Sequence, residues 1–308
     1  MKSAVRCCIM NRSPADSPRL APVRLARLHL ARLHLAPVHL APVHLAPVRR
    51  LAAAALLALA GLTAATPALA GRSCEAKPMR AERVMNGLTL AQRTAAVLDQ
   101  QGASVALIAR IGQDLSRYGL TYSHLGVAFK RDGAWRVAHK LNDCGTAEAG
   151  LFWQGLGEFF LDDPFRFEAG ILIPTPEVQQ ALAPVFSARE SVLRLHEPRY
   201  NLVSYPWSQR YQQSNQWVLE TMAMALSPGV GNRTAAQAWL RERGYQPTVL
   251  ALGTATRLGA RLTAANVAFD DHPSEKRFAG QIETITVESV FAFAERAGLG
   301  RRIAPVTP

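Results

Sequence analysis

Two short apolar segments joined by residues 131–134, Arg-Asp-Gly-Ala, constrain the fold more than any other feature of this chain. Segments 122–130 and 135–141 are rich in residues that strands prefer, and Asp-Gly is a typical hairpin turn. They predict two adjacent antiparallel strands. A two- or four-residue connection would place His124 and His139 on one face of the hairpin, whereas a three- or five-residue connection would separate them.

The rest of the chain predicts several helices around this hairpin. Apolar spacing and end signals indicate strands over 104–110 and 165–173, an extended segment over 200–207, and helices over 89–101, 150–161, 176–187, 214–226, 234–243 and 286–297. Residues 245–283 follow no clear pattern. We expect an α+β fold, a single domain over 71–308, with a small antiparallel sheet packed with helices.

Residues 1–70 have the composition of a leader. A five-residue repeat over 21–48 turns 140° per repeat on a helix, so it cannot form an apolar stripe. Its four histidines suggest metal binding, but a low-complexity expansion explains them more simply. Arg49-Arg50, the apolar run 51–62 and Ala-Leu-Ala at 68–70 predict a signal peptide cleaved near Ala70. The run is short for a membrane span, so we expect a periplasmic or secreted protein without a transmembrane segment after signal removal.

Charge and cysteine content follow from this division. The chain carries +12, but residues 1–70 hold nine Lys/Arg and one Asp, which leaves 26 basic and 22 acidic residues. A balance of +4 does not favour a nucleic-acid partner. Cys74 and Cys144 would meet an oxidising compartment, so we expect a disulfide between them, with a free Cys144 as the alternative.

His124 and His139 are the first candidates for a functional site. Two histidines on one hairpin face can orient each other, or one can serve as the base for a nucleophile. The alternative is a pair of buried histidines bonded to backbone carbonyls. No motif for a nucleotide, a zinc protease or a redox dithiol occurs, so we expect no cofactor and no metal.

Five segments carry a resemblance to a known family: ALIARIGQD (106–114), YSHLGVAF (122–129), WRVAHKLNDCGT (135–146), YNLVSYPWS (200–208) and QSNQWVLE (213–220). They resemble the bacterial domain-of-unknown-function family 2145, whose members are secreted. More distantly, the order of motifs is similar to the circularly permuted papain-like superfamily of NlpC-type peptidases and lecithin–retinol acyltransferase-like enzymes. That resemblance implies a permuted papain-like fold, with His124 and His139 as the first two catalytic positions.

The third position of the papain-like pattern differs in this chain. The nucleophilic cysteine would align with Asn215, beside Ser214, at the start of helix 214–226. An amide cannot attack a carbonyl, so Asn215 would serve as a cap or an oxyanion donor. Ser214, or less readily Cys144, remains a candidate nucleophile with His124 as base. The resemblance implies that the helix start points at His124.

Other polar residues would line the same cleft under this interpretation. These secondary candidates are Tyr200, Asn201, Gln213, Gln216, Asp271 and His272. We expect a binding or accessory module of the cell envelope, with a peptidoglycan peptide, a lipid or another envelope component as partner. The alternative is an active hydrolase or an acyl or peptidyl transferase that uses Ser214 or Cys144.

Overall fold

The computed structural model of the protein describes residues 78–308. The expected signal peptide, its cleavage site near Ala70 and Cys74 lie outside the described residues. The described part of the chain belongs to one compact unit, and its mixture of helices and antiparallel strands confirms the expected α+β class.

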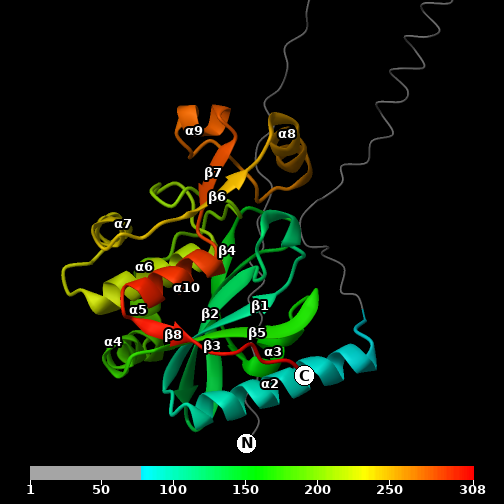
Figure 1. Cartoon of the computed structure of the whole chain (residues 1–308), viewed down its shortest axis with the longest axis vertical. Helices are drawn as coiled ribbons and strands as arrows, with labels where there is room; N and C mark the ends of the chain where they lie inside the picture. Colours follow the sequence, from blue (N-terminus) through cyan, green and yellow to red (C-terminus); the bar gives the residue numbers. More distant parts are fainter. Residues whose placement is uncertain (1–77) are drawn as a thin grey trace, which may run out of the picture. The chain divides into compact units, whose positions relative to one another are not determined.

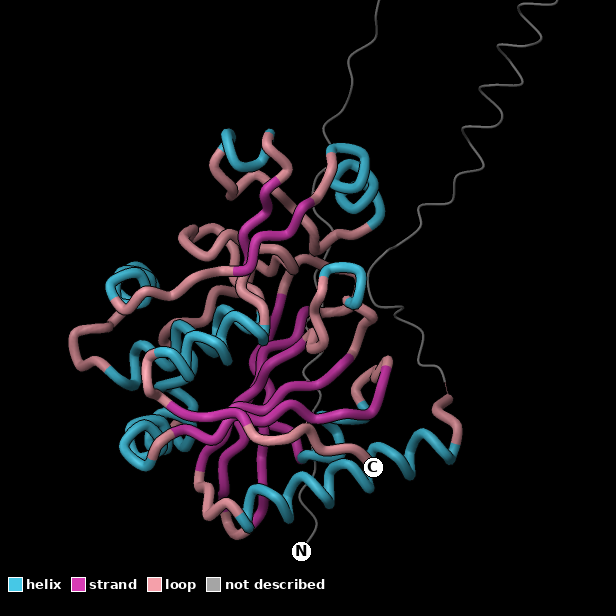
Figure 2. The backbone as a smooth tube through the Cα atoms, in the orientation of Figure 1, coloured by secondary structure: helices cyan, strands magenta, loops and turns pink. Residues whose placement is uncertain are grey.

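A six-stranded sheet forms the centre of the described structure (Figures 1 and 2). Its strand order is β4-β3-β2-β1-β5-β8, and each neighbouring pair is antiparallel. The strands are β1 (Val105–Ile111), β2 (His124–Arg131), β3 (Ala134–Asn142), β4 (Ala149–Gly155), β5 (Arg166–Pro174) and β8 (Gly300–Arg302).

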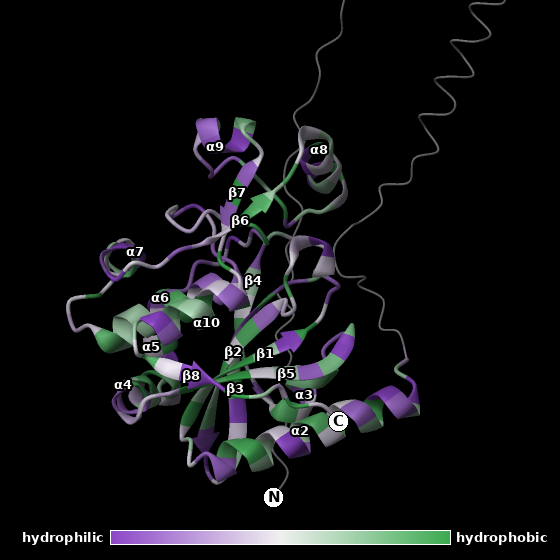
Figure 3. Cartoon of the chain, in the orientation of Figure 1, coloured by the Kyte–Doolittle hydropathy of each residue, from purple (hydrophilic) through white to green (hydrophobic). Residues whose placement is uncertain are grey.

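Helices cover both faces of this sheet (Figure 1). One face packs against α2 (Ala81–Gln100) and α3 (Leu156–Leu161). The opposite face packs against α4 (Pro176–Ser187), α6 (Ser214–Leu226), α7 (Arg233–Glu242) and α10 (Val287–Arg296), with the short α5 (Arg189–Leu193) beside α4. Strand alternation separates the two cores: Leu125 and Val127 face α6, whereas Ala128 faces α2 and α3. The inner strands are correspondingly apolar (Figure 3).

Residues 245–283, which show no clear sequence pattern, form a second and smaller sheet with two short helices. β6 (Thr248–Ala251) and β7 (Gln281–Thr284) pair as a two-stranded antiparallel sheet, accompanied by α8 (Thr254–Thr263) and α9 (Ser274–Phe278). Figure 2 shows these two strands apart from the large sheet. None of the helices within residues 78–308 has the length and the hydropathy that crossing a bilayer requires.

The central hairpin forms with the two-residue turn. Arg131 pairs with Ala134, and the turn residues Asp132 and Gly133 have φ of 51° and 75°. Two positive φ angles are typical of the hairpin turn that Asp-Gly favours. Val127 pairs with Ala138, so partner numbers sum to 265 and His124 shares a face with His139. This prediction from the sequence is confirmed.

Three local predictions differ from the structure. Residues 150–155, expected to open a helix, form β4 instead, because the β3 edge offers a continuous ladder of backbone partners from Arg136 to Asn142. Glycines at 150 and 155 also weaken a helix. Residues 200–207, expected to be extended, form turns and irregular loop. Helix α2 starts at Ala81, eight residues before the predicted start at 89.

Candidate functional site

His124 and His139 form a direct side-chain pair. The His124 Nε2 atom lies 2.9 Å from His139 Nδ1, and the rings meet edge to face. Gly126 stands opposite His139 in the hairpin register and makes this approach possible. A Cβ atom at position 126 would lie 2.6 Å from Val137 Cγ1 and 3.2 Å from His139 Cβ. The histidine-x-glycine pattern is therefore a packing requirement of the pair.

Gln154 on β4 extends the pair into a chain of three polar groups. Its Oε1 atom lies 2.8 Å from His139 Nε2. With that oxygen facing the ring, His139 Nε2 must carry hydrogen, so a neutral His139 accepts at Nδ1. His124 then donates from Nε2, and its Nδ1 carries the lone pair. With the amide oxygen in this position, the hydrogen-bond chain orients both rings and assigns the lone pair of His124 to Nδ1.

The histidines are held by an aromatic wall from α3. Phe159 packs against both rings, with ring centroids 5.9 Å from His124 and 5.3 Å from His139. His139 is fully buried, and His124 is 8% exposed. His124 nevertheless lines a cavity of about 400 Å³ at the end of the sheet. We call this cavity the polar chamber. It is lined by Arg110, Gly112, Gln113, Ser123, His124, Lys140, Leu141, Asn142, Asp162, Asp163, Tyr200, Leu202, Ala264, Asn266 and Val267.

Arg110 places a second polar group beside His124. It is the register partner of His124 on the neighbouring strand β1, so the two side chains leave the same face of the sheet. Its guanidinium binds the side chain and the backbone carbonyl of Asp162 and stacks over Phe159 at 5.4 Å. The ion pair fixes the arginine head at the chamber wall, where a carbonyl or carboxylate would be recognised.

Lys140 lines the polar chamber from the opposite face of β3. Its side chain is fully buried, and its ammonium donates to Glu197 O at 2.5 Å and to Gln212 Oε1 at 2.9 Å. Burial lowers the pKa of Lys140 from its ordinary value of 10.5 to about 7, and Arg233 acts in the same direction. A lysine of this kind changes charge near neutral pH.

Ser214 and Asn215 begin α6, and α6 packs on the sheet face opposite the histidine pair. Ser214 lies beside the buried Tyr200; burial raises the pKa of Tyr200, and hydrogen bonding from Ser214 opposes that rise. Asn215 Nδ2 donates to Ile285 O at 3.2 Å. Among residues 78–308, no hydrogen bond joins either side chain to His124. The approach of the helix start to His124 therefore stays a prediction.

The amides around Ser214 serve the packing of α6. Gln213 caps the helix by accepting from Asn215 N at 3.0 Å, and it donates to Ile285 O. Gln212 and Gln216 belong to a buried network around Glu220, which also binds Arg233 at 2.7 Å. A buried carboxylate needs such partners because desolvation is expensive. Gln212 and Gln216 thus serve a buried ion pair, whereas Gln213 holds the start of α6 to the Ile285 carbonyl.

The other secondary candidates also hold loops together. Asn201 donates to Ala268 O at 2.9 Å and accepts from Val203 N and Ala268 N. The Asp271 carboxylate accepts from Tyr205 N at 2.7 Å and lies 3.0 Å from His272 Nδ1. His272 Nε2 reaches Glu283 O at 2.9 Å, so both ring nitrogens have acceptor partners. Of the secondary candidates, Tyr200 alone lines the polar chamber.

Cys144 lies in the loop between β3 and β4, outside the lining of the polar chamber. Within residues 78–308, no group of three or more His, Cys, Asp and Glu side chains is placed to hold a metal ion.

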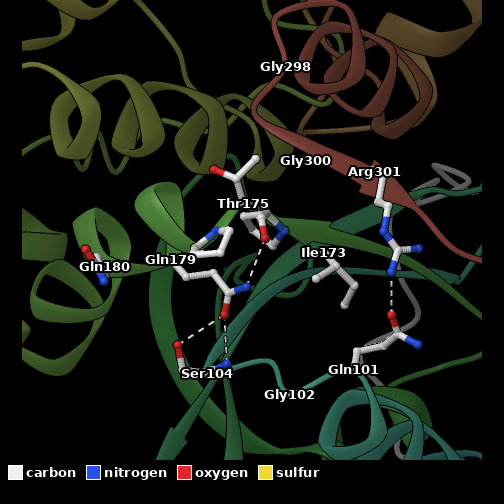
Figure 4. Close-up of a pocket in the computed structure, with 12 residues that line it drawn as sticks. Gln101, Gly102, Ser104, Ile173, Thr175, Gln179, Gln180, Gly298, Gly300 and Arg301 are labelled. Atoms are coloured by element: carbon white, nitrogen blue, oxygen red, sulfur yellow. Dashed lines mark hydrogen bonds between the residues drawn. The ribbon is translucent and has the colours of Figure 1, made fainter.

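A larger hollow of about 600 Å³ lies between the start of β1 and the ends of β5 and β8 (Figure 4). Its polar side chains bond to their neighbours. Gln179 accepts from Ser104 N at 2.8 Å and donates to Pro174 O at 2.9 Å, while Arg301 donates to Gln101 at 2.7 Å. Gln179 thus joins the start of α4 to β1. The polar chamber, with its oriented histidine, is the better candidate for a functional site.

Sequence reasoning missed four residues of this site: Arg110, Gln154, Asp162 and Lys140. Gln154 was hidden by the wrong helix prediction for its segment. Lys140 had a usable signal, because it follows His139 on a strand and so faces the opposite, apolar side. A lysine at an apolar-facing strand position predicts either burial with partners or a strand end.

Comparisons with known proteins agree with the family resemblance. The model of a family described as "Uncharacterized protein conserved in bacteria (DUF2145)" matches residues 97–294, which include the histidine pair and all of α6. No curated protein and no solved structure matches the chain, and the permuted papain-like topology stays a resemblance. The match spans more than half of the sequence, and the chain therefore belongs to the bacterial family DUF2145.

Proposed function

We propose that the protein is a ligand-binding or accessory module of the bacterial cell envelope, and that the polar chamber binds the carboxylate or amide end of an envelope peptide. The single observation that carries this proposal is the chain from His124 through His139 to Gln154, with contacts of 2.9 and 2.8 Å. It holds one imidazole in a defined orientation and tautomer at a chamber wall that also contains Arg110.

Binding is favoured over hydrolysis by what surrounds His124. A hydrolase of the serine type needs the hydroxyl within hydrogen-bond reach of the base. Within the described part of the chain, Ser214 is engaged near Tyr200 and has no hydrogen bond to His124. The chamber instead offers groups that recognise carbonyls and carboxylates: the guanidinium of Arg110 and the side-chain amides of Asn142 and Asn266.

The proposed location rests on the leader and the cysteines. Arg49-Arg50, the apolar run 51–62 and the Ala-Leu-Ala motif support export and cleavage near Ala70. We propose that Cys74 and Cys144 then form a disulfide in the oxidising compartment. Amino-terminal sequencing of the exported protein tests the cleavage. Alkylation with and without reduction, followed by mass spectrometry, tests the disulfide, and two alkylated cysteines without reduction would contradict it.

The binding proposal is tested with a peptidoglycan stem tetrapeptide as the probe. We expect saturable binding by calorimetry and a shift of the His124 ring resonances in NMR spectra. His124→Gln should weaken binding at least ten-fold, whereas Arg131→Gln on the exposed hairpin turn should leave it unchanged. No binding at millimolar peptide would refute an envelope-peptide site.

The same samples test the hydrolase alternative. Peptide or ester cleavage that is lost in both His124→Gln and Ser214→Ala would overturn the binding-only proposal. Labelling by a fluorophosphonate in the wild type, absent in Ser214→Ala, would do the same. We expect neither cleavage nor labelling, because the hydroxyl and the imidazole are not hydrogen-bonded to each other.

A further inference from the structure

A second cavity of about 220 Å³ adjoins the polar chamber, and we call it the apolar chamber. The two share Gln113, Ser123, Leu202 and Val267 as lining residues, so they lie side by side. Further apolar lining comes from the segment around η1 (Ser116–Tyr118), from β6 and the residue after it, from α8, from the loop between α8 and α9, and from the residue after β7: Leu115, Tyr118, Leu120, Leu250, Leu252, Ala260, Phe269 and Ile285.

Asn215 gives the apolar chamber one polar feature that its surroundings do not satisfy. The side chain is 5% exposed and lines the chamber, and its Nδ2 donates to Ile285 O. Its Oδ1 atom is buried and has no hydrogen-bond partner in the described structure. Leaving a buried acceptor unsatisfied costs roughly 1–3 kcal/mol, so a ligand that supplies an N–H or O–H recovers that cost.

Neighbouring polar groups in the chamber are already engaged. Gln213 donates to Thr284 Oγ1 at 3.3 Å as well as to Ile285 O, and Thr286 Oγ1 bonds to Thr248 Oγ1 at 2.7 Å. Among residues 78–308 that line the chamber, Asn215 Oδ1 is thus a buried acceptor without a partner, set among largely apolar walls. A cavity of about 150 Å³ suffices to hold benzene, so this one can hold a short hydrocarbon chain.

We propose that the apolar chamber binds the acyl chain of an N-acylated amino acid or peptide. The amide N–H donates to Asn215 Oδ1, and the carboxylate end extends into the polar chamber toward Arg110 and His124. This assignment deepens the proposed function and rests on it for the carboxylate end. The acyl end rests independently on the apolar lining and on the unpaired Asn215 oxygen.

Four small probes separate these contributions by calorimetry: N-octanoylglycine, N-octanoylsarcosine, N-acetylglycine and octanamide. N-octanoylglycine should bind at least ten-fold more tightly than N-acetylglycine, because burying each methylene group contributes about 0.8 kcal/mol. N-octanoylsarcosine lacks the N–H and should bind roughly 3- to 10-fold more weakly than N-octanoylglycine. Equal binding of the octanoyl and acetyl glycines would overturn the proposal.

Two variants locate the chain. Ala260→Phe on α8 fills the apolar chamber. In this variant N-octanoylglycine should no longer bind more tightly than N-acetylglycine. Leu258→Ala on the same helix, where Leu258 is 58% exposed, is the matched control and should keep that advantage. Asn215→Leu should make N-octanoylglycine and N-octanoylsarcosine bind equally. An octanoyl advantage that persists unchanged in Ala260→Phe would refute this location.

The probes also distinguish failure of this inference from failure of the proposed function. If octanamide binds to the wild type and this binding is lost in Ala260→Phe, the acyl site stands. It stands even if the carboxylate of N-octanoylglycine adds no affinity. In that case the carboxylate role of the polar chamber is wrong. If instead the stem tetrapeptide binds through His124 and no octanoyl probe binds more tightly than its acetyl counterpart, the acyl site is wrong and the polar site stands.

Discussion

Lys140 makes the stability of this fold depend on pH in a calculable way. Its pKa falls from 10.5 to about 7 on folding, chiefly through burial. Between these two values the unfolded chain binds the proton and the folded chain does not, so the unfolding free energy rises with pH. Integrating over pH 7 to 9 gives an increase of roughly 2 kcal/mol from this one group.

The test compares wild type with Lys140→Met, which keeps the length of the side chain and removes the charge. Urea unfolding at pH 7 and at pH 9 gives the free energy of each protein, and the pH-independent effect of the substitution cancels in the difference. The wild type should gain roughly 2 kcal/mol more than Lys140→Met over this interval. Lys130→Met, at a lysine whose side chain is 41% exposed, serves as the control and should behave as wild type.

The refuting outcome is an equal pH dependence in wild type and Lys140→Met. It would mean that the lysine keeps its charge in the folded protein, held by Gln212 and the Glu197 carbonyl. The opposite sign, with the wild type losing stability relative to the variant as pH rises, would refute the burial argument altogether. Measurements stop at pH 9 because tyrosines begin to ionise in the unfolded chain above that value.

Three further predictions concern the histidine chain and the buried network. Gln154→Glu should raise the apparent pKa of the His124–His139 pair by about one unit or more, because a carboxylate stabilises the protonated ring. NMR titration measures this pKa, and a titration curve identical to that of Gln154→Leu would contradict the prediction. Gly126→Ala should cost about 1–3 kcal/mol in urea unfolding and disturb the 2.9 Å contact, whereas Gly229→Ala, which meets no atom within 4 Å, should cost much less. Glu220→Gln should lower the unfolding free energy by about 3–5 kcal/mol, because Arg233 keeps a buried charge without a counter-ion. Adding Arg233→Met should recover part of that loss. Equal stability of the wild type and Glu220→Gln would argue against a buried ion pair.

Local signals in the sequence were sufficient for the hairpin and for most helices. Asp-Gly fixed the turn, the turn fixed the register, and the register placed the two histidines on one face. The strand β4 was missed because an edge strand owes its conformation to the backbone of β3, which a window of neighbouring residues does not contain. The aromatic and glycine residues of 150–155 satisfy a weak helical pattern equally well.

The candidate site was predictable only in part, for the same reason. Alternation along β2 and β3 predicts that His124 and His139 meet. It does not predict that α6 packs on the other face, because the layer order depends on long-range packing. Gln213, Asn215 and Gln216 were predicted to line a cleft, but their side chains make hydrogen bonds that hold α6 in place, to Ile285, Ser204 and Glu220.

The walls of the apolar chamber belong to two separately packed cores, and this division has a dynamic consequence. Leu250, Leu252, Phe269 and Ile282 form a small cluster of their own beside the two-stranded β6–β7 sheet, while Ile285 belongs to the main core. A two-stranded ladder over so small a core opens locally at lower free energy than the six-stranded sheet. Pairing of β6 with β7 and binding of a ligand in the apolar chamber are then thermodynamically linked. The amide hydrogens of 248–251 should exchange more slowly as occupancy of the chamber rises.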